Sequence, residues 1–181
     1  ICGDITDKEI FDHLVSQAKK TNVELIMATP PCQGMSTAGK LDKDDIRNIL
    51  FSQAVEMIKK VKPKYFLFEN VPAFMTTYVQ IGEKKDLIPE LIKKSLNSKY
   101  DLEFSIVNAK DYEVPQSRER MILLGTRKDI SYKWKLPSPS DKVITMRDAI
   151  GHLPILDPFV RDLPDKAFKK LFPKFDERKK K

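Results

Sequence analysis

The chain has 181 residues, with 33 lysines and arginines against 26 aspartates and glutamates, and its formal net charge is +7. A length of this order suits one globular domain, or the core of a larger one. Hydrophobic residues make up 41% and charged residues 33%, and no apolar run approaches the roughly 18 residues that a bilayer span needs. The composition therefore excludes a disordered chain and a membrane-spanning helix. Because the first residue is Ile1 and not Met, we expect a fragment or a processed piece.

The positive charge is concentrated at the end of the sequence. Residues 161–181 hold nine basic and four acidic residues. This segment is either a solvated lysine-rich tail or a segment that contacts phosphates. The two cysteines, Cys2 and Cys32, have no CxxC spacing. The sequence therefore predicts neither a disulfide framework nor a zinc site, and it favours a reducing cytoplasm.

Hydrophobic periodicity predicts an alternation of helices and strands. In chain order, the predicted elements are a helix over residues 7–20, a buried strand over 23–28, a helix over 46–61, a strand over 65–68, a helix over 87–96, and strands over 102–107 and 120–124. The first helix follows an S/T-x-x-E pattern, which is typical of a capping box in which Thr6 is the N-cap. The order of the elements predicts a parallel α/β sheet with a mixed edge.

The sequence changes character near residue 130. Prolines become frequent beyond this point, and only residues 145–151 have a helical pattern. We therefore predict an α/β core over residues 1–130. Residues 131–181 form a proline- and lysine-rich segment that leads toward a region absent from the sequence.

Reactive side chains lie near the ends of three predicted strands. Strand 23–28 leads to Cys32, strand 65–68 leads to Glu69, and the loop before strand 120–124 contains Arg118 and ends at Arg120. Taken singly, these residues are ordinary: a buried cysteine, a solvated glutamate and a surface ion-pair cluster. Catalytic groups of open α/β sheets collect at the carboxyl ends of the strands. The joint placement therefore predicts a site at one edge of the sheet.

The motifs resemble those of the DNA (cytosine-5) methyltransferase family. PPCQGMS at 30–36, ENV at 69–71 and QSRER at 116–120 are similar to the nucleophile, acidic and paired-arginine motifs of that family. Three weaker similarities follow the family's order: GDIT at 3–6, DIRNILF at 45–51 and NAKDY at 108–112. The resemblance covers about residues 1–155. It implies part of a class I, Rossmann-like methyltransferase sheet with an antiparallel edge strand, in which strands one and two are missing.

The resemblance also implies the roles of the catalytic residues. Cys32 adds as a thiolate to C6 of a cytosine, which activates C5 toward the methyl group of S-adenosylmethionine. Glu69 hydrogen-bonds N3 and the exocyclic amine of the base. Arg118 holds the carbonyl O2, and Arg120 supports it. No metal is required.

Binding residues are implied in the same way. The cofactor residues are Asp4, Ile5, Pro31 and Leu50. The DNA-binding residues are Gln33, Ser36 and Arg47. Because the target carbon is inaccessible inside a duplex, the cytosine has to be flipped out. The polar stretch 34–45 is either a disordered surface loop or, by resemblance, a mobile loop that closes over the flipped base.

The sequence departs from the family pattern at two places. None of its six glycines forms the G-x-G of the family's cofactor loop, and the acidic residue expected after strand two is missing too. In addition, Tyr112 is followed by Glu113, where the family usually has glycine. We expect the missing N-terminal strands to be supplied by another segment, chain or copy.

Our leading hypothesis is a DNA cytosine-5 methyltransferase of the restriction–modification type that acts on double-stranded DNA in a bacterial cytoplasm. Two alternatives remain open: a tRNA cytosine-5 methyltransferase, and an inactive fragment that serves only as a nucleic-acid-binding module. A cysteine hydrolase is disfavoured, because neither His13 nor His152 lies beside a strand end where it could activate Cys32. We expect no association with a membrane.

Overall fold

The structure is a computed structural model that describes residues 2–31, 50–81 and 84–153. The chain divides into two compact units, Ile1–Ile144 and Thr145–Lys181, and each is described by itself. The division predicted at residue 130 rests on composition alone and stays a prediction. The described elements of the first unit are α1 (Lys8–Lys20), β1 (Leu25–Ala28), α2 (Phe51–Val61), β2 (Tyr65–Asn70), the 3-10 turn η2 (Pro72–Thr76), β3 (Tyr78–Ile81), β4 (Lys84–Leu87), α3 (Ile88–Leu96), β5 (Tyr100–Asn108), the 3-10 turn η3 (Ala109–Tyr112) and β6 (Glu119–Arg127).

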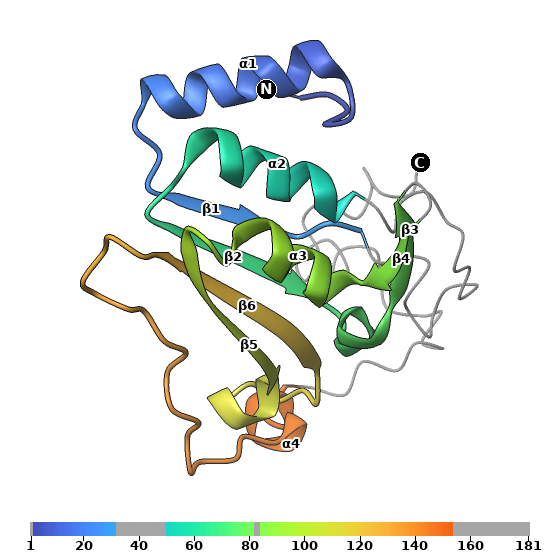
Figure 1. Ribbon diagram of the computed structural model, residues 1–181. Helices are drawn as coiled ribbons and strands as arrows, with labels where there is room; N and C mark the ends of the chain where they lie inside the picture. The colour runs from blue at the N-terminus through green and yellow to red at the C-terminus, as the bar shows by residue number, and fades with distance from the viewer. Residues whose placement is uncertain (1, 32–49, 82–83, 154–181) are drawn as a thin grey trace, which may run out of the picture. The chain divides into compact units, whose positions relative to one another are not determined.

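The main sheet of the described residues has four strands in the order β1-β2-β6-β5 (Figure 1). β1 and β2 are parallel, whereas β6 runs antiparallel to both β2 and β5. The predicted mixed α/β sheet is confirmed. The antiparallel strand lies between β2 and β5, and not at the edge where we expected it. Its buried residues explain this inner position, because Met121 and Leu123 are fully enclosed.

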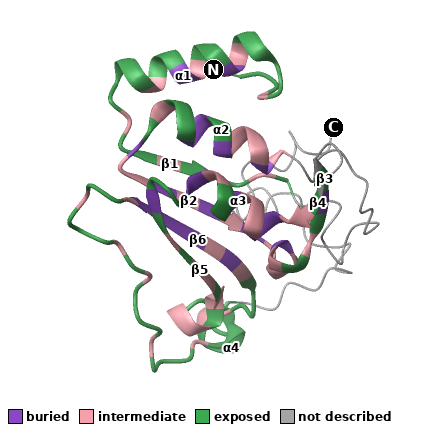
Figure 2. Ribbon diagram, viewed as in Figure 1, coloured by how far each residue is buried: buried purple, intermediate pink, exposed green. Residues whose placement is uncertain are grey.

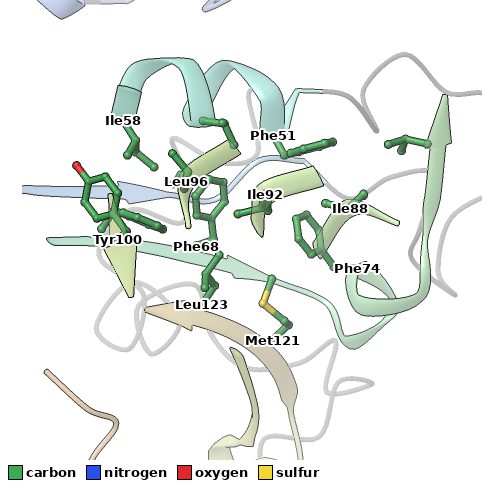
Figure 3. Close-up of a cluster of buried hydrophobic side chains, with 14 residues drawn as sticks. Phe51, Ile58, Phe68, Phe74, Ile88, Ile92, Leu96, Tyr100, Met121 and Leu123 are labelled. Atoms are coloured by element: carbon green, nitrogen blue, oxygen red, sulfur yellow. The ribbon is translucent and has the colours of Figure 1, made fainter. Parts of the chain in front are cut away.

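Helices α2 and α3 cover one face of this sheet. Figure 3 shows Ile58 of α2 and Ile92 of α3 over the same side-chain layer as Phe68 of β2 and Leu123 of β6. Alternate residues of β2 are buried, as expected for a strand that turns one face to a core. The predicted helix over 87–96 is thus confirmed by α3, which begins one residue later.

Helix α1 packs on α2 through a smaller apolar cluster that includes Phe11, Val15 and Met57. The N-cap of α1 is Asp7, whose carboxylate accepts hydrogen bonds from the backbone N–H groups of residues 9 and 10. The predicted capping box with Thr6 is therefore wrong. Both the N–H and the hydroxyl of Thr6 instead donate to Asp4 Oδ1, at 2.8 and 2.7 Å. A local turn of this kind competes with a cap for the same groups.

The described residues cover the opposite face of the sheet only in part. The segment after β6 returns over the start of β2, where Tyr65 donates a hydrogen bond to the carbonyl oxygen of Tyr132 and its ring lies 5.4 Å from that of Trp134. On β1, Leu25 and Met27 are 42% and 66% exposed. Figure 2 shows the contrast between exposed β1 and the buried stretches of β2 and β6.

In the second unit, the described residues form one short helix, α4 (Met146–Ile150). The side chain of Thr145 accepts from the N–H of Asp148, and the Asp148 carboxylate accepts from the N–H of Thr145. This reciprocal pair is a capping box, and it confirms the helical pattern predicted over 145–151.

No helix in the described part of the chain is long and apolar enough to cross a membrane.

Candidate active site

The candidate site lies at the carboxyl edge of the sheet, where β1 and β2 end and the antiparallel β6 begins. Glu69 of β2 is directly opposite Ile122 of β6, so Arg120, two residues before Ile122, is a diagonal neighbour on the same face. The Nε of Arg120 lies 2.8 Å from Glu69 Oε1. The structure thus brings together the predicted carboxylate and one of the two predicted arginines.

Both members of the Glu69–Arg120 pair are partly exposed. A pair in contact with water adds little to stability. Its main effect is geometric, because a guanidinium holds a carboxylate in a defined orientation. Arg120 is itself oriented, since its Nη1 donates to the carbonyl oxygen of Glu119 at 2.7 Å. The Glu69 carboxylate is therefore fixed at the sheet edge while it remains accessible to a ligand.

Asn70 connects β2 to the segment that follows β1. The residue is buried, with only 3% of its surface exposed. The Nδ2 donates to the carbonyl oxygen of Pro30 at 3.1 Å, and the Oδ1 accepts from the N–H of Val71 at 2.9 Å. Asn70 is not among the site residues predicted from the sequence. The signal was present, however, because an amide occupies the next inward position after Phe66 and Phe68 in the alternating pattern of β2.

The connection between β5 and β6 is held by Asn108. Its Oδ1 accepts from the backbone N–H of Arg118 at 2.9 Å and from that of Lys110 at 3.2 Å, and its Nδ2 donates to Ser117 Oγ at 3.2 Å. The backbone just before Arg120 is thereby fixed. The Arg118 side chain is exposed, and among the described residues no hydrogen bond or ion pair joins it to Glu69. The two predicted arginines thus have different surroundings.

Glu113 follows η3 with a φ of 61°, in the left-handed region that favours glycine. The glycine that the resemblance implies at this position would suit such a turn. In this chain Glu113 keeps the left-handed turn, and its carboxylate accepts a hydrogen bond from Ser140 Oγ at 2.9 Å. The departure from the family pattern therefore leaves the turn in place.

The residues assigned to the cofactor come from three places in the fold. Asp4 precedes α1, and its pKa is lowered by the hydrogen bonds that it accepts from Thr6. Ile5 packs on the cluster between α1 and α2. Pro31 follows β1 and is exposed, and Leu50 is the partly buried residue before α2. Their roles stay predictions.

Four predicted residues and one predicted loop lie outside the described residues. They are Cys32, Gln33, Ser36, Arg47 and the stretch 34–45. Among the residues that are described, no group of three or more His, Cys, Asp or Glu side chains is arranged to hold a metal ion.

The sequence model of the C-5 cytosine-specific DNA methylase family matches residues 1–180. The chain belongs to this family. The resemblance drawn from the ENV, PPCQGMS and QSRER motifs is thereby confirmed.

The curated relatives of the chain include Type II methyltransferases. The chain is 37% identical over 163 residues to the Type II methyltransferase M1.HgaI of Avibacterium volantium, covering 87% of the chain and 44% of that protein. It is 40% identical over 126 residues to the Type II methyltransferase M.MthTI of Methanothermobacter thermautotrophicus, covering 69% of the chain and 37% of that protein. The chain thus spans less than half the length of these relatives.

The fold is also similar to that of a solved structure. A protein from E. coli, assigned as a DNA modification methyltransferase encoded within a prophage, superposes with a TM-score of 0.64 and 26% identity. The match covers 85% of this chain and 42% of that one. The expected Rossmann-like methyltransferase architecture is confirmed.

Proposed function

We propose that the protein containing this chain transfers a methyl group from S-adenosylmethionine to C5 of cytosine in double-stranded DNA, as the modification enzyme of a restriction–modification system. Family membership and the Type II relatives support this reaction. The observation that carries the proposal is the Glu69–Arg120 pair. It lies on the edge of the sheet where Asn70 holds the segment that leads to Cys32.

The chemistry requires a nucleophile and an acid on the same base. C5 of cytosine is a poor nucleophile until another group adds to C6. In the proposed step the Cys32 thiolate forms a bond to C6, and the electrons of the C5–C6 double bond become available at C5. Glu69 donates a proton toward N3 and accepts from the exocyclic amine. Arg118 holds O2, and Arg120 holds Glu69 in position.

The cycle closes with two bond changes. S-adenosylmethionine, when bound, supplies an electrophilic methyl group. After C5 has taken this group, a water molecule accepts the C5 proton, the electrons of the C5–H bond restore the C5–C6 double bond, and the bond between C6 and Sγ of Cys32 breaks. The cysteine is released as a thiolate, so each turnover leaves the protein unchanged.

The described residues fit the adenine part of this cofactor. Both hydrogen bonds from Thr6 go to Oδ1 of Asp4. Oδ2 receives none among the described residues, so it can accept from an adenine amine. Ile5 and Leu50 supply aliphatic surface for the ring. A carboxylate acceptor beside apolar side chains is suited to a neutral aromatic amine.

Duplex DNA is preferred over tRNA as the substrate. The relatives at 37% and 40% identity are Type II methyltransferases. Because the target base is stacked inside a duplex, the proposal includes extrusion of the cytosine into the site. Gln33, Ser36 and Arg47 are proposed to contact the DNA around the extruded base.

The test measures the transfer of a labelled methyl group by the native-length protein, with duplex DNA and tRNA as parallel substrates. We expect Cys32→Ser to abolish transfer, because an alcohol supplies almost no anion near pH 7. We expect Glu69→Gln to lower kcat by roughly two to four orders of magnitude. Glu103→Gln, which makes the same chemical change at an exposed position of β5, is the control and should leave kcat unchanged.

Three outcomes would contradict parts of the proposal. A Cys32→Ser variant that keeps more than a few per cent of activity would exclude Cys32 as the nucleophile. Unchanged kcat in Glu69→Gln, with weaker DNA binding only, would reduce Glu69 to a binding residue. Transfer to tRNA but not to DNA would establish the alternative substrate.

A further inference from the structure

The hairpin formed by β3 and β4, which is absent from the elements predicted above, follows β2 closely along the chain. It begins eight residues after Asn70, once the chain has passed through η2. Figure 1 shows the hairpin beyond the carboxyl end of β2, the strand that contains Glu69. The two strands are antiparallel, with Tyr78 opposite Leu87, Val79 opposite Asp86 and Gln80 opposite Lys85.

One face of the hairpin is anchored to the body of the domain. Val79 is buried in the main core. Asp86 forms an ion pair with Lys94 of α3, and the hydrogen bond from Lys94 lowers the pKa of the Asp86 carboxyl. The backbone N–H of Ile88 donates to the carbonyl oxygen of Thr77 at 3.1 Å, which closes the base of the hairpin. The hairpin is therefore held in place relative to α3.

The other face of the hairpin is directed to solvent. Residues directly opposite in an antiparallel pair share a face, and neighbours along a strand alternate. Tyr78, Gln80, Lys85 and the partly buried Leu87 therefore lie on the face opposite to Val79 and Asp86. Tyr78 is 53% exposed, and the Nζ of Lys85 lies 6.0 Å from the centre of its ring. This face, which we call the hairpin outer face, combines an aromatic ring, an amide and an ammonium group.

We infer that the hairpin outer face binds the sugar–phosphate backbone of the DNA duplex beside the target cytosine. The inference rests on the proposed function, because it needs DNA at the carboxyl edge of the sheet. Lysine, glutamine and tyrosine side chains are common donors to phosphate oxygens, and such contacts fix the register of a protein on DNA without reading its sequence. The negative charge of Asp86 is balanced by Lys94 on the anchored face, so Lys85 gives the outer face a net positive charge.

Lys85 differs from other exposed lysines of the chain in its position relative to Glu69. Lys99 precedes β5, at the opposite end of the sheet from Glu69. A duplex with its cytosine at Glu69 has to pass the carboxyl edge, where the hairpin lies. The anchored base means that the outer face needs little ordering when DNA arrives, which lowers the entropic cost of binding.

The experiment measures the affinity of the native-length protein for labelled duplex DNA over a range of salt concentrations. Lys85→Ala should raise Kd about three- to tenfold at low salt, equally for duplexes with and without the recognition site. It should also reduce the slope of log Kd against log salt by about one, as expected for one lost phosphate contact. Lys85→Arg should restore the slope, and Lys99→Ala is the control that should leave it unchanged.

Tyr78→Ala should raise Kd in the same range. The value of kcat at saturating DNA should be unchanged in all four variants.

The two proposals fail in different ways. A wild-type protein that methylates DNA, with Kd and salt slope unaltered in Lys85→Ala and Tyr78→Ala, would overturn the inference and leave the proposed function intact. The inference would also be overturned if these variants changed only self-association or binding to another protein. Absence of methyl transfer to any DNA by the wild-type protein would contradict the proposed function itself.

Discussion

The Nδ2 of Asn70 donates a hydrogen bond of 3.1 Å to the carbonyl oxygen of Pro30, and this bond ties the end of β2 to the segment that leaves β1. Asn70 directly follows Glu69, and Pro30 stands two positions before Cys32. One buried amide therefore connects the strand that carries the acid with the segment that carries the proposed nucleophile. Because the amide is shielded from water, a loss of its hydrogen bonds would leave buried polar atoms without partners, which lowers the stability of the fold.

Asn70→Asp is predicted to impair both stability and catalysis. The change keeps the size of the side chain but places a carboxylate oxygen against the Pro30 carbonyl oxygen, where an N–H donor is needed. We expect the free energy of unfolding to fall by about 1–3 kcal/mol. We expect kcat to fall by roughly ten- to a hundredfold, because small displacements of reacting groups have effects of this order.

Urea unfolding and methyl transfer at saturating DNA measure these two effects. Asn97→Asp, at the exposed C-cap of α3, is the matched control and should change neither quantity by much. If Asn70→Asp lowered stability but kept full kcat under conditions where it is folded, Asn70 would be a structural residue and not a positioning one.

Local pattern was sufficient to predict the main sheet but not the hairpin. The alternation of β2 and the helical spacing of α3 are strong signals, because both elements turn a continuous apolar face to the core. The strands β3 and β4 have four residues each, and β4 reads KKDL. Their pairing depends on burial of Val79 and on the Asp86–Lys94 ion pair, which are tertiary contacts.

The candidate site could be predicted from the sequence only in part, because element order is visible in the sequence whereas strand register is not. The carboxyl ends of parallel strands meet at one edge of a sheet, so the convergence of Glu69 with the arginine motif followed from the order of the elements. Which arginine contacts Glu69 depends on the register of β2 and β6. This register places Ile122 opposite Glu69 and hence Arg120 on the diagonal, and the sequence contains no signal for it.

Glu113→Gly is predicted to be tolerated, unlike most glycine substitutions. A side chain at φ 61° carries a steric cost of about 1 kcal/mol, which glycine removes. This gain offsets the greater freedom of glycine in the unfolded chain and the lost contact with Ser140. We expect the free energy of unfolding to stay the same or to rise by up to about 1 kcal/mol.

The comparison for Glu113→Gly is Lys110→Gly, which lies in η3 at a negative φ. Here glycine brings no steric relief, and we expect a loss of about 0.5–1 kcal/mol. Chemical denaturation of the native-length protein measures both values. Equal losses in the two variants would show that the left-handed turn carries no strain.

Tyr100 is predicted to make stability fall at alkaline pH. Only 2% of the residue is exposed, its hydroxyl donates to the carbonyl oxygen of Pro63 at 2.9 Å, and burial raises its pKa from 10 to about 12. Below pH 10 the side chain is protonated in both the folded and the unfolded state, so the contribution is fully present. Between pH 10 and 12 the unfolded chain loses this proton while the folded protein keeps it. Stability is therefore lost as the pH rises, by up to about 2–3 kcal/mol.

Free energies of unfolding of the native-length protein, measured between pH 8 and 11, test the role of Tyr100. Tyr100→Phe should be less stable at pH 8 by about 1–3 kcal/mol, since the Pro63 carbonyl loses its donor, but its stability should fall less steeply above pH 10. Tyr132→Phe changes an exposed tyrosine and should keep the wild-type slope. An unaltered slope in Tyr100→Phe would assign the alkaline loss to other groups.

The last prediction concerns the outer edge of β1. Among the described residues, β1 pairs only with β2, so the N–H and C=O groups of its other edge have no strand partner. Leu25 and Met27 add exposed apolar surface on the same strand. Proteins protect such edges because unpaired strands associate with one another. We propose that residues of another segment, chain or copy cover this edge, and we expect the 181-residue chain alone to self-associate and to lack a cooperative unfolding transition.

Light scattering after size exclusion, together with urea unfolding, measures both properties. Met27→Lys should increase the monomer fraction, because a charge on an exposed strand opposes association, whereas Met146→Lys on α4 should not. A monodisperse 181-residue monomer that unfolds cooperatively would show that β1 needs no further partner.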